Sequence, residues 1–271
     1  MPEPSVPEKG LAAITGASSG IGASFARKLA ALGYDLLLIA RREDRLRSLA
    51  TELAEAHHIK AEVMAADLAL DADLASVAER IASTPNLALL VNNAGFGSHG
   101  YFFEIDVASQ DQMHRLHVLA TMRLAHAALS NMVPRGAGGV INVASVAGFG
   151  QSPQNVSYCS TKAWMISFSE GLSIELASKG LAVKAQALCP GFTFSEFHDV
   201  LGMDRSAIPG SLWMPADFVV EESLKGLASG KIIVVPGWRY KLVVAGMKMI
   251  PRPLLRKISV SGVRRFRKKK A

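Results

Sequence analysis

Short apolar runs alternate along the chain with segments whose apolar residues recur at helical spacing. The segments between the runs predict helices at about 21–32, 42–58 and 71–83. Runs that are apolar throughout suit strands buried on both faces, as in a parallel sheet. Seven such runs predict strands at residues 11–15, 35–40, 61–66, 87–91, 140–143, 182–188 and 231–235.

The alternation of strands and helices indicates the fold class. Strands joined through helices form βαβ units, and their right-handed crossovers put helices on both faces of the sheet. The sequence therefore predicts an α/β fold with a doubly wound parallel sheet of about seven strands in three layers, α/β/α.

Composition narrows the class of protein. The chain has 271 residues, which suits one α/β domain with a large core. Its only cysteines, Cys159 and Cys189, are too few for a disulfide framework or a cysteine-rich metal site, and they favour a reducing compartment. The first residues carry acid and proline, unlike a signal peptide, and no apolar run reaches the ~18 residues of a membrane span. We expect a cytoplasmic protein without a metal.

Positive charge is concentrated at the C-terminal end. Residues 238–271 hold twelve of the thirty Lys and Arg residues and no acid, so that the net charge of +7 becomes −5 for the residues before them. Two alternatives suit this extension. In one, residues 238–250 pack over the substrate pocket or a neighbouring subunit and the last residues are solvated; in the other, the extension associates with an anionic membrane surface. We favour the first for 238–250 and the second for 254–270. A terminal basic run alone does not specify nucleic acid, and none is expected.

A glycine-rich turn lies between the first predicted strand and the first predicted helix. Glycines allow a sharp turn and let a pyrophosphate approach the backbone, and the helix N-terminus supplies N–H donors. This context favours a dinucleotide site in a Rossmann-type sheet over an ordinary connecting turn. The candidate cofactor-binding residues of the turn are Gly16, Ser18, Ser19, Gly20, Ile21 and Gly22.

The end of the second predicted strand indicates which dinucleotide is bound. A carboxylate about 20 residues after the glycines bonds the ribose 2′-hydroxyl of NAD, but this chain has Arg41 and Arg42 there. Guanidinium groups match a phosphate, so the sequence favours NADP(H) over NAD(H). The alternative is that Arg42 opens a charged, solvated helix.

Further motifs follow at the ends of the later strands. They are Asp67-Leu68, the Asn-Asn-Ala-Gly of residues 92–95, Ser145 and the Pro-Gly-Phe-Thr of residues 190–193, and the Tyr-Cys-Ser-Thr-Lys of residues 158–162 begins 13 residues after Ser145. With the glycine turn, this ordered set resembles the short-chain dehydrogenase/reductase family, in its Thr-Gly-x-x-x-Gly-x-Gly form with Tyr-x-x-x-Lys. The resemblance covers about residues 9–237. It implies one dinucleotide-binding catalytic domain over residues 1–237, followed by the basic extension 238–271, and hydride transfer between a nicotinamide and a carbonyl or alcohol carbon.

The residue types suit that chemistry. Hydride addition develops negative charge on the carbonyl oxygen, which needs an acid and further donors. Lys162 lies one helical turn after Tyr158, where its charge would lower the pKa of the tyrosine. The resemblance implies that Tyr158 is the acid/base, that Ser145 bonds the substrate oxygen and that Lys162 also bonds the nicotinamide ribose. In isolation, Tyr158 and Lys162 would suit an amphipathic pair on a surface helix.

The resemblance also implies contacts along the cofactor cleft. Asp67 and Leu68 would meet the adenine, although Asp67 also suits a helix N-cap. Thr193 would meet the nicotinamide carboxamide. The implied contacts are Asp67, Leu68, Asn92, Ala94, Gly95, Tyr158, Lys162, Pro190, Gly191 and Thr193.

One position departs from the family's pattern. The long helix after the Asn-Asn-Ala-Gly motif usually carries an Asn that belongs to a proton relay to the active-site Lys, and aligning residues 113–129 with that helix puts His117 there. His117 would hold a water through a ring nitrogen, as a fourth catalytic residue, or serve the helix without a catalytic role. The sequence leaves both alternatives open.

Aromatic residues gather in the segments 95–103, 147–157 and 192–215, which should surround the nicotinamide. These segments hold nine of the eighteen aromatic residues and a single basic residue, Arg205. Apolar pockets favour apolar ligands, so we expect a lipophilic ketone, aldehyde or secondary alcohol as substrate, although some of these rings will fill the core.

The sequence also gives an expectation for the oligomeric state and one alternative function. Similar enzymes associate through the helices that here begin near Gln110 and Asn155, so we expect a homodimer or homotetramer. The alternative function is a cofactor-sensing or membrane-associated regulatory protein that retains the fold. The presence of Ser145, Tyr158 and Lys162 favours an enzyme.

Overall fold

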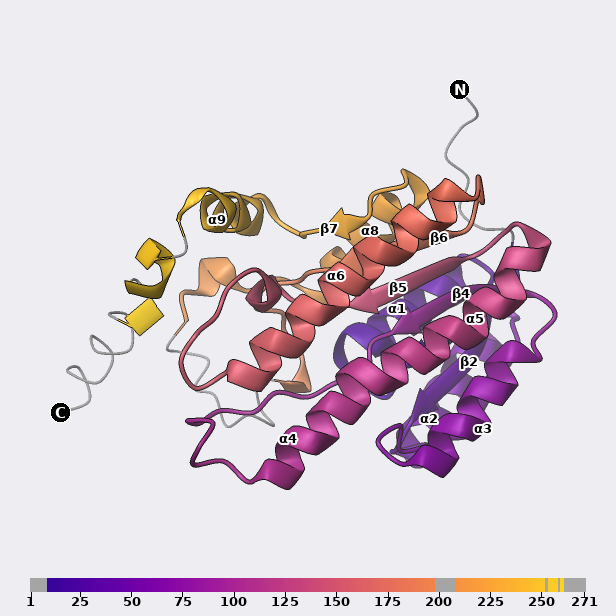
Figure 1. The fold of residues 1–271 in the computed structure, drawn as a ribbon. Coiled ribbons are helices and arrows are strands. Elements are labelled where there is room, and N and C mark those ends of the chain that lie inside the picture. The colour runs from indigo at the N-terminus through magenta and orange to yellow at the C-terminus, as the bar shows by residue number, and fades with distance from the viewer. Residues whose placement is uncertain (1–8, 198–207, 252, 258, 261–271) are drawn as a thin grey trace.

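A computed structural model describes residues 9–197, 208–251, 253–257 and 259–260. Its centre is one parallel sheet with strand order β3-β2-β1-β4-β5-β6-β7 (Figure 1). The order reverses between β1 and β4, which is where doubly wound sheets open a crevice at the carboxyl ends of their strands. The strands are β1 (Leu11–Thr15), β2 (Asp35–Ala40), β3 (Ala61–Ala65), β4 (Leu87–Asn92), β5 (Gly139–Val143), β6 (Lys184–Leu188) and β7 (Ile233–Val234).

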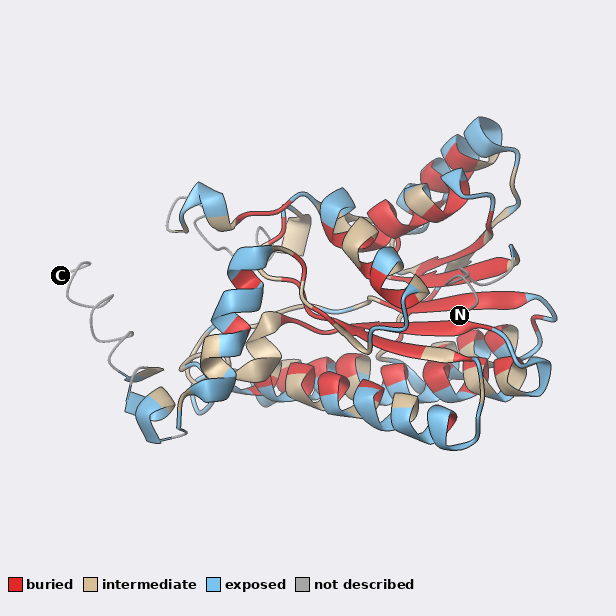
Figure 2. Ribbon diagram, turned by 90° about the horizontal axis from the view of Figure 1, so that it is seen from above, coloured by how far each residue is buried: buried red, intermediate tan, exposed pale blue. Residues whose placement is uncertain are grey.

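Helices cover both faces of the sheet and confirm the expected three layers. One face packs against α1 (Gly20–Ala31), α2 (Glu43–His57) and α8 (Ala216–Ala228). The other packs against α3 (Asp71–Ala82), α5 (Thr121–Arg135) and α6 (Val156–Ser178). Figure 2 shows the strands as buried ribbons between helices whose outer sides are exposed.

The apolar runs explain why these segments are central strands. Side chains alternate across a strand, so β2 sends Leu36 and Leu38 into one core and Leu37 and Ile39 into the other. All four are buried. Each contributes about 1.5–3 kcal/mol by leaving water, which favours a strand with two covered faces.

A long helical segment precedes β5 and differs from the expected span of 113–129. It begins at Val107, where the Asp106 side chain accepts a hydrogen bond from the Ala108 N–H (3.3 Å). It runs through α4 (Val107–His114), a π-helical turn η1 (Arg115–Ala120) and α5, and ends at Gly136, whose φ is 68°. The π-helical turn was not expected from the pattern of apolar residues.

The last strand is shorter than its apolar run. β7 pairs only through Ile233 and Val234, with Ala187 and Leu188 of β6. Because β7 lies at the edge of the sheet, it has one neighbour to pair with. A short 3₁₀ turn, η2 (Val146–Phe149), follows β5, and another, η4 (Gly210–Leu212), precedes α8.

The first part of the basic extension forms α9 (Trp238–Met249), which packs on the body, as the first alternative predicted. Tyr240 and Val244 are buried, and the Tyr240 hydroxyl accepts from the Phe192 N–H (3.0 Å) and donates to the Leu212 carbonyl (2.8 Å). No helix among the described residues is long and apolar enough to cross a membrane. Most of 254–270 lies outside the described residues, and the membrane alternative gains no support.

Candidate active site

A cavity of about 560 Å³ opens at the carboxyl edge of the sheet. Its walls come from the segments that follow β1, β2, β3, β4, β5 and β6, on both sides of the point where the strand order reverses. This volume is typical of cofactor and small-molecule sites. The expected residues that line it are Gly16, Ser18, Ser19, Gly20, Ile21, Arg41, Arg42, Asp67, Leu68, Ala94, Gly95, Ser145, Tyr158, Lys162, Pro190, Gly191 and Thr193.

The glycine turn forms one end of the cavity as a cradle of bare backbone. Gly16 and Gly20 have φ values of 67° and 56°, which favour glycine. A Cβ atom on Gly16 would lie 2.8 Å from Nδ2 of Asn93. The first turn of α1 carries no acid, so its N–H groups and dipole are available to an anion. The cradle therefore fits a dinucleotide pyrophosphate.

Gly22 and Asn92, both expected at the cofactor, lie behind the cavity wall. A Cβ atom on Gly22 would lie 2.3 Å from the Gly16 carbonyl oxygen, so this glycine lets α1 pack against the turn. Asn92 is buried, and its Nδ2 donates to Oδ1 of Asn142 (2.9 Å). Both shape the site without lining it.

Asn93, next to Asn92, was not singled out from the sequence and does line the cavity. Its Nδ2 donates to the carbonyl oxygens of Thr15 (2.9 Å) and Gly16 (3.2 Å), and its N–H donates to Oγ1 of Thr15 (2.9 Å). These bonds join the ends of β1 and β4, so Asn93 holds the crevice at its fixed width.

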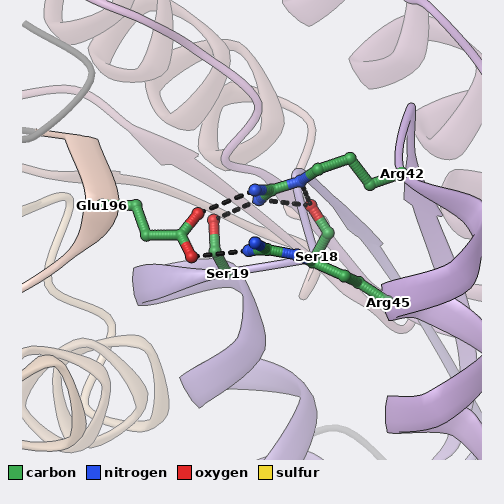
Figure 3. A network of polar contacts seen from close by, with 5 residues as sticks. All are labelled: Ser18, Ser19, Arg42, Arg45 and Glu196. Atoms are coloured by element: carbon green, nitrogen blue, oxygen red, sulfur yellow. Dashed lines mark hydrogen bonds and ion pairs between the residues drawn. The ribbon is translucent and has the colours of Figure 1, made fainter.

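The arginine end of the cavity contains a polar network (Figure 3). Arg42 donates to Oγ of Ser18 (3.0 Å) and of Ser19 (2.8 Å). It also pairs with Oε2 of Glu196 (2.8 Å), whose Oε1 pairs with Arg45 (2.5 Å). Arg42 therefore faces the glycine turn.

Arg41 and Asp67 form a looser pair beside this network, with 3.9 Å between their charged atoms. The Asp67 carboxylate accepts from the Ala69 N–H (3.0 Å), which stabilises the turn after β3. The residue that caps α3 is Leu70, so Asp67 is not a helix cap here.

Ser145, Tyr158 and Lys162 meet at the other end of the cavity. Tyr158 and Lys162 are one turn apart on α6, and Ser145 follows β5. The Lys162 ammonium lies 5.8 Å from the centre of the Tyr158 ring and donates to the Val143 carbonyl (2.8 Å). This brings a phenol, a hydroxyl and an amine to one wall.

Burial shifts the pKa of both ionisable groups at this wall. It raises the pKa of Tyr158 to about 12, while a hydrogen bond with Ser145 acts in the opposite direction. It lowers the pKa of Lys162 to about 7. At neutral pH Tyr158 therefore keeps its proton, so it is ready to act as an acid.

His117 is fully buried behind this wall, within η1, and does not line the cavity. Its Nε2 accepts from the Phe96 N–H (3.2 Å), so Nδ1 carries the proton and donates to Oγ1 of Thr161 (2.9 Å). Thr161 in turn donates to the Tyr158 carbonyl (3.0 Å). Burial, followed by the charge of Lys162, lowers the pKa of His117 well below its usual value. Because both ring nitrogens bond the protein, neither is left to hold a water.

Gly95 is matched to this histidine. A Cβ atom at Gly95 would lie 2.7 Å from Nε2 of His117. The imidazole therefore packs directly against the backbone that forms the cavity wall, and a larger residue at position 95 would push it away.

Some, but not all, of the aromatic residues expected around the nicotinamide line the cavity. Phe96, Phe192 and Phe197 line the cavity, and the Phe197 ring lies 5.8 Å from that of Tyr158. Phe102 and Phe103 are exposed instead, with 54 % and 82 % of their surface in contact with solvent. The lining at this end therefore combines three apolar rings with polar groups such as Ser145, Tyr158 and Lys162.

Thr193 and Gly191 form the floor under these rings. The Thr193 hydroxyl donates to the Gly191 carbonyl (3.0 Å), and Thr193 is buried. A Cβ atom on Gly191 would lie 2.0 Å from Cζ of Tyr240, so the floor rests directly on α9.

Besides Asn93, sequence reasoning missed Glu196, Arg45 and Thr161. Glu196 and Arg45 are 151 positions apart, and no motif joins them. Thr161 lies inside the Tyr-x-x-x-Lys motif, at a position that the motif leaves unspecified.

Comparisons with known proteins agree with this geometry. A family model described as short chain dehydrogenase matches residues 10–205. The 3-oxoacyl-[acyl-carrier-protein] reductase FabG of Rickettsia prowazekii is 32 % identical over 243 residues, which cover 88 % of this chain and 96 % of that protein. A short-chain dehydrogenase from Sphingobium yanoikuyae, solved with NADPH, is 32 % identical with a TM-score of 0.80 over 89 % of this chain and 96 % of that one. The bulky-bulky ketone specific alcohol dehydrogenase from Comamonas testosteroni is 31 % identical with a TM-score of 0.76, over 89 % and 95 % of the two chains.

Proposed function

The chain belongs to the short-chain dehydrogenase family, and on that premise we propose that it is an NADPH-dependent reductase of lipophilic ketones or aldehydes, with the reverse oxidation of secondary alcohols, and that Tyr158 is its acid/base. The observation that carries the proposal is the meeting of Tyr158, Lys162 and Ser145 on one wall of the same cavity whose other end is the glycine cradle. A cofactor that spans the cavity would thus reach both ends.

The chain's own residues would each have a defined task. The bound nicotinamide supplies or accepts the hydride. Tyr158, protonated at neutral pH because burial raises its pKa to about 12, would give its phenolic proton to the carbonyl oxygen as charge develops there. The Ser145 hydroxyl would donate a hydrogen bond to the same oxygen. A positive charge on Lys162 would stabilise the phenolate that remains.

The arginine end supports NADP(H) over NAD(H). Arg42 bonds the serines of the glycine turn, Arg45 joins it at Glu196, and Arg41 and Arg42 line the cavity. Guanidinium groups and hydroxyls are the donors that a 2′-phosphate takes in proteins. The Sphingobium relative was solved with NADPH, which supports the same choice.

The catalytic end supports an apolar substrate. The rings of Phe96, Phe192 and Phe197 line it, and such walls favour apolar ligands. The relative from Comamonas is described as specific for bulky-bulky ketones. Both observations favour a ketone with apolar groups on its two sides over a small anionic acid.

The test is NADPH oxidation with a panel of ketones and aldehydes graded by chain length and ring size. We expect turnover that improves with apolar bulk. The matched control is Tyr158→Phe, which keeps the ring and removes the transferable proton. Its turnover should fall by about 10² or more, while NADPH binding measured by titration persists. A wild-type protein that binds NADPH and turns over none of the panel would favour the regulatory alternative instead.

A further inference from the structure

Among the residues that the structure describes, Glu196 is the one carboxylate that lines the arginine end of the cavity and pairs with two guanidinium groups. It comes from the chain after Thr193, on the substrate side, and reaches across to α2 and the glycine turn. Figure 3 shows its two oxygens between Arg42 and Arg45, with Ser18 and Ser19 beside them. A carboxylate of the protein therefore occupies a set of donors suited to an anion.

The same donors would serve the 2′-phosphate of NADPH. Hydrogen bonds from Arg42 and Arg45 hold the pKa of Glu196 below its usual value, so at neutral pH its side chain is an anion. Arg42 also bonds both serine hydroxyls, which ties the pair to the turn that cradles the pyrophosphate. A phosphate and a carboxylate compete for guanidinium groups because both accept paired N–H donors.

We propose that Glu196 is a specificity-determining residue that occupies the place of the cofactor's 2′-phosphate in the free protein, and that this phosphate takes Arg42 and Arg45 from it when NADPH binds. The inference rests on the proposed use of NADPH. It adds that an anion of the chain itself competes with the phosphate and so moderates the affinity for NADPH.

Replacing the Glu196 carboxylate by the 2′-phosphate is favourable because the ion pairs of Glu196 with Arg42 and Arg45 are weak. The side chains of Arg42, Glu196 and Arg45 are 41 %, 43 % and 47 % exposed, and ion pairs in contact with water contribute little. A phosphate monoester carries a charge of about −1.5 to −2 near neutral pH and outcompetes a single carboxylate. The 2′-hydroxyl of NADH carries no charge, so NADH would leave Glu196 in place.

The position of Glu196 connects the two ends of the cavity. The next residue, Phe197, has its ring against Tyr158, and a Cβ atom on Gly20 would lie 2.9 Å from Cβ of Ser195. Displacing Glu196 therefore acts on the short stretch of chain that also covers the proposed proton donor.

Calorimetric titration of the cofactor-free protein tests the proposal with two probes, adenosine 2′,5′-bisphosphate and 5′-AMP, which differ only in the 2′-phosphate. The variants are Glu196→Gln and, as a matched control, Glu52→Gln, whose carboxylate pairs with Arg27 on the exposed side of α1. Arg42→Ala tests the arginine site itself.

We expect Glu196→Gln to bind the bisphosphate about three- to tenfold more tightly, as loss of one or two exposed ion pairs allows. Its affinity for 5′-AMP should stay within about twofold of wild type, and Glu52→Gln should match wild type with both probes. The gain should shrink at high salt.

The contrary outcomes separate the inference from the proposed function. If Arg42→Ala weakens bisphosphate binding while Glu196→Gln leaves it unchanged or weakens it, the competition is wrong and the NADPH preference stands. If Arg42→Ala leaves bisphosphate binding unchanged, the arginine site is not a phosphate site, and the cofactor preference fails together with the inference.

Discussion

At the scale of single residues, the buried amine of Lys162 belongs to the proposed catalytic site and also makes the stability of the fold depend on pH. Its ammonium group is buried against the Val143 carbonyl, and burial lowers its pKa from 10.5 to about 7. Between these two pH values the unfolded chain binds a proton that the folded chain does not. Stability therefore rises with pH across that window because of this residue, by about 1.4 kcal/mol for each pH unit.

Replacing Lys162 with Met makes this dependence measurable. We expect Lys162→Met to be more stable than wild type at pH 6, where wild type must bury the cation, and to lose that advantage steadily from pH 7 to pH 9. The measurement is the free energy of unfolding by denaturant at several pH values. Parallel curves for the two proteins would mean that Lys162 folds without a shifted pKa. Turnover should be lost in the variant at every pH.

His117 supports the wall without facing the cavity. His117→Asn would leave the Phe96 N–H and the Thr161 hydroxyl, both held by the imidazole at present, with poorer partners. Unsatisfied buried groups cost about 1–3 kcal/mol each, so we expect the free energy of unfolding to fall by about 2–4 kcal/mol. His126→Asn, at an exposed position on the same long helix, is the control.

A pH profile distinguishes this positioning role from proton transfer. Because the pKa of His117 lies well below 6.5, His117 should cause no inflection near pH 6.5 in the pH profile of kcat/KM. The profiles of the wild type and of His117→Asn should therefore have the same shape in that range. Such an inflection would make His117 a member of the relay.

At the scale of elements, α9 belongs to the substrate end of the site. The Tyr240 hydroxyl joins the Phe192 N–H to the Leu212 carbonyl, and its ring packs under Gly191. Tyr240→Phe keeps the ring and removes both hydrogen bonds. We expect it to cost about 1–3 kcal/mol of stability and to raise KM for the carbonyl substrate more than KM for NADPH. Equal effects on the two constants would contradict a local role.

Elements that depend on the local pattern of apolar residues could be predicted from the sequence. Elements that depend on contacts between distant segments could not. The strands were predicted within a few residues because apolar runs that must be buried on both faces leave little freedom. β7 is shorter than its run because only two of its residues find partners on β6. The turn η1 depends on how the helix around His117 meets α6 and the wall, and apolar spacing does not record that.

The site divides in the same way. Gly16 and Ser145 were predicted because each belongs to a short motif at a strand end, and Tyr158 and Lys162 because they are spaced one turn apart on a helix. Glu196 was not, because its partners lie more than 150 positions earlier in the chain and nothing near it marks the pairing.

At the scale of the whole molecule, we expect a symmetric dimer or tetramer. The helices proposed as interfaces expose apolar side chains: Val107 on α4, Met122 on α5, and Val156 and Ile174 on α6. Light scattering at micromolar protein should show a dimer or larger species, and Ile174→Glu should shift it toward monomer. Leu70→Glu, at an exposed apolar position outside these helices, is the control. A monomer in the wild type would contradict the expectation.

The reversal of strand order between β1 and β4 also bears on how such a chain could be recombined. Residues before β4 form the cradle and the arginine end, whereas the proton donor and the apolar walls come after it. A hybrid joined near Asn86, in the link between α3 and β4, would take the glycine cradle and the arginines from one parent and the proton donor and apolar walls from the other. The pair formed by Arg42 and Glu196 crosses that junction. Such hybrids would take Arg42 from one parent and the residue at position 196 from the other. Their preference between NADPH and NADH would then match neither parent.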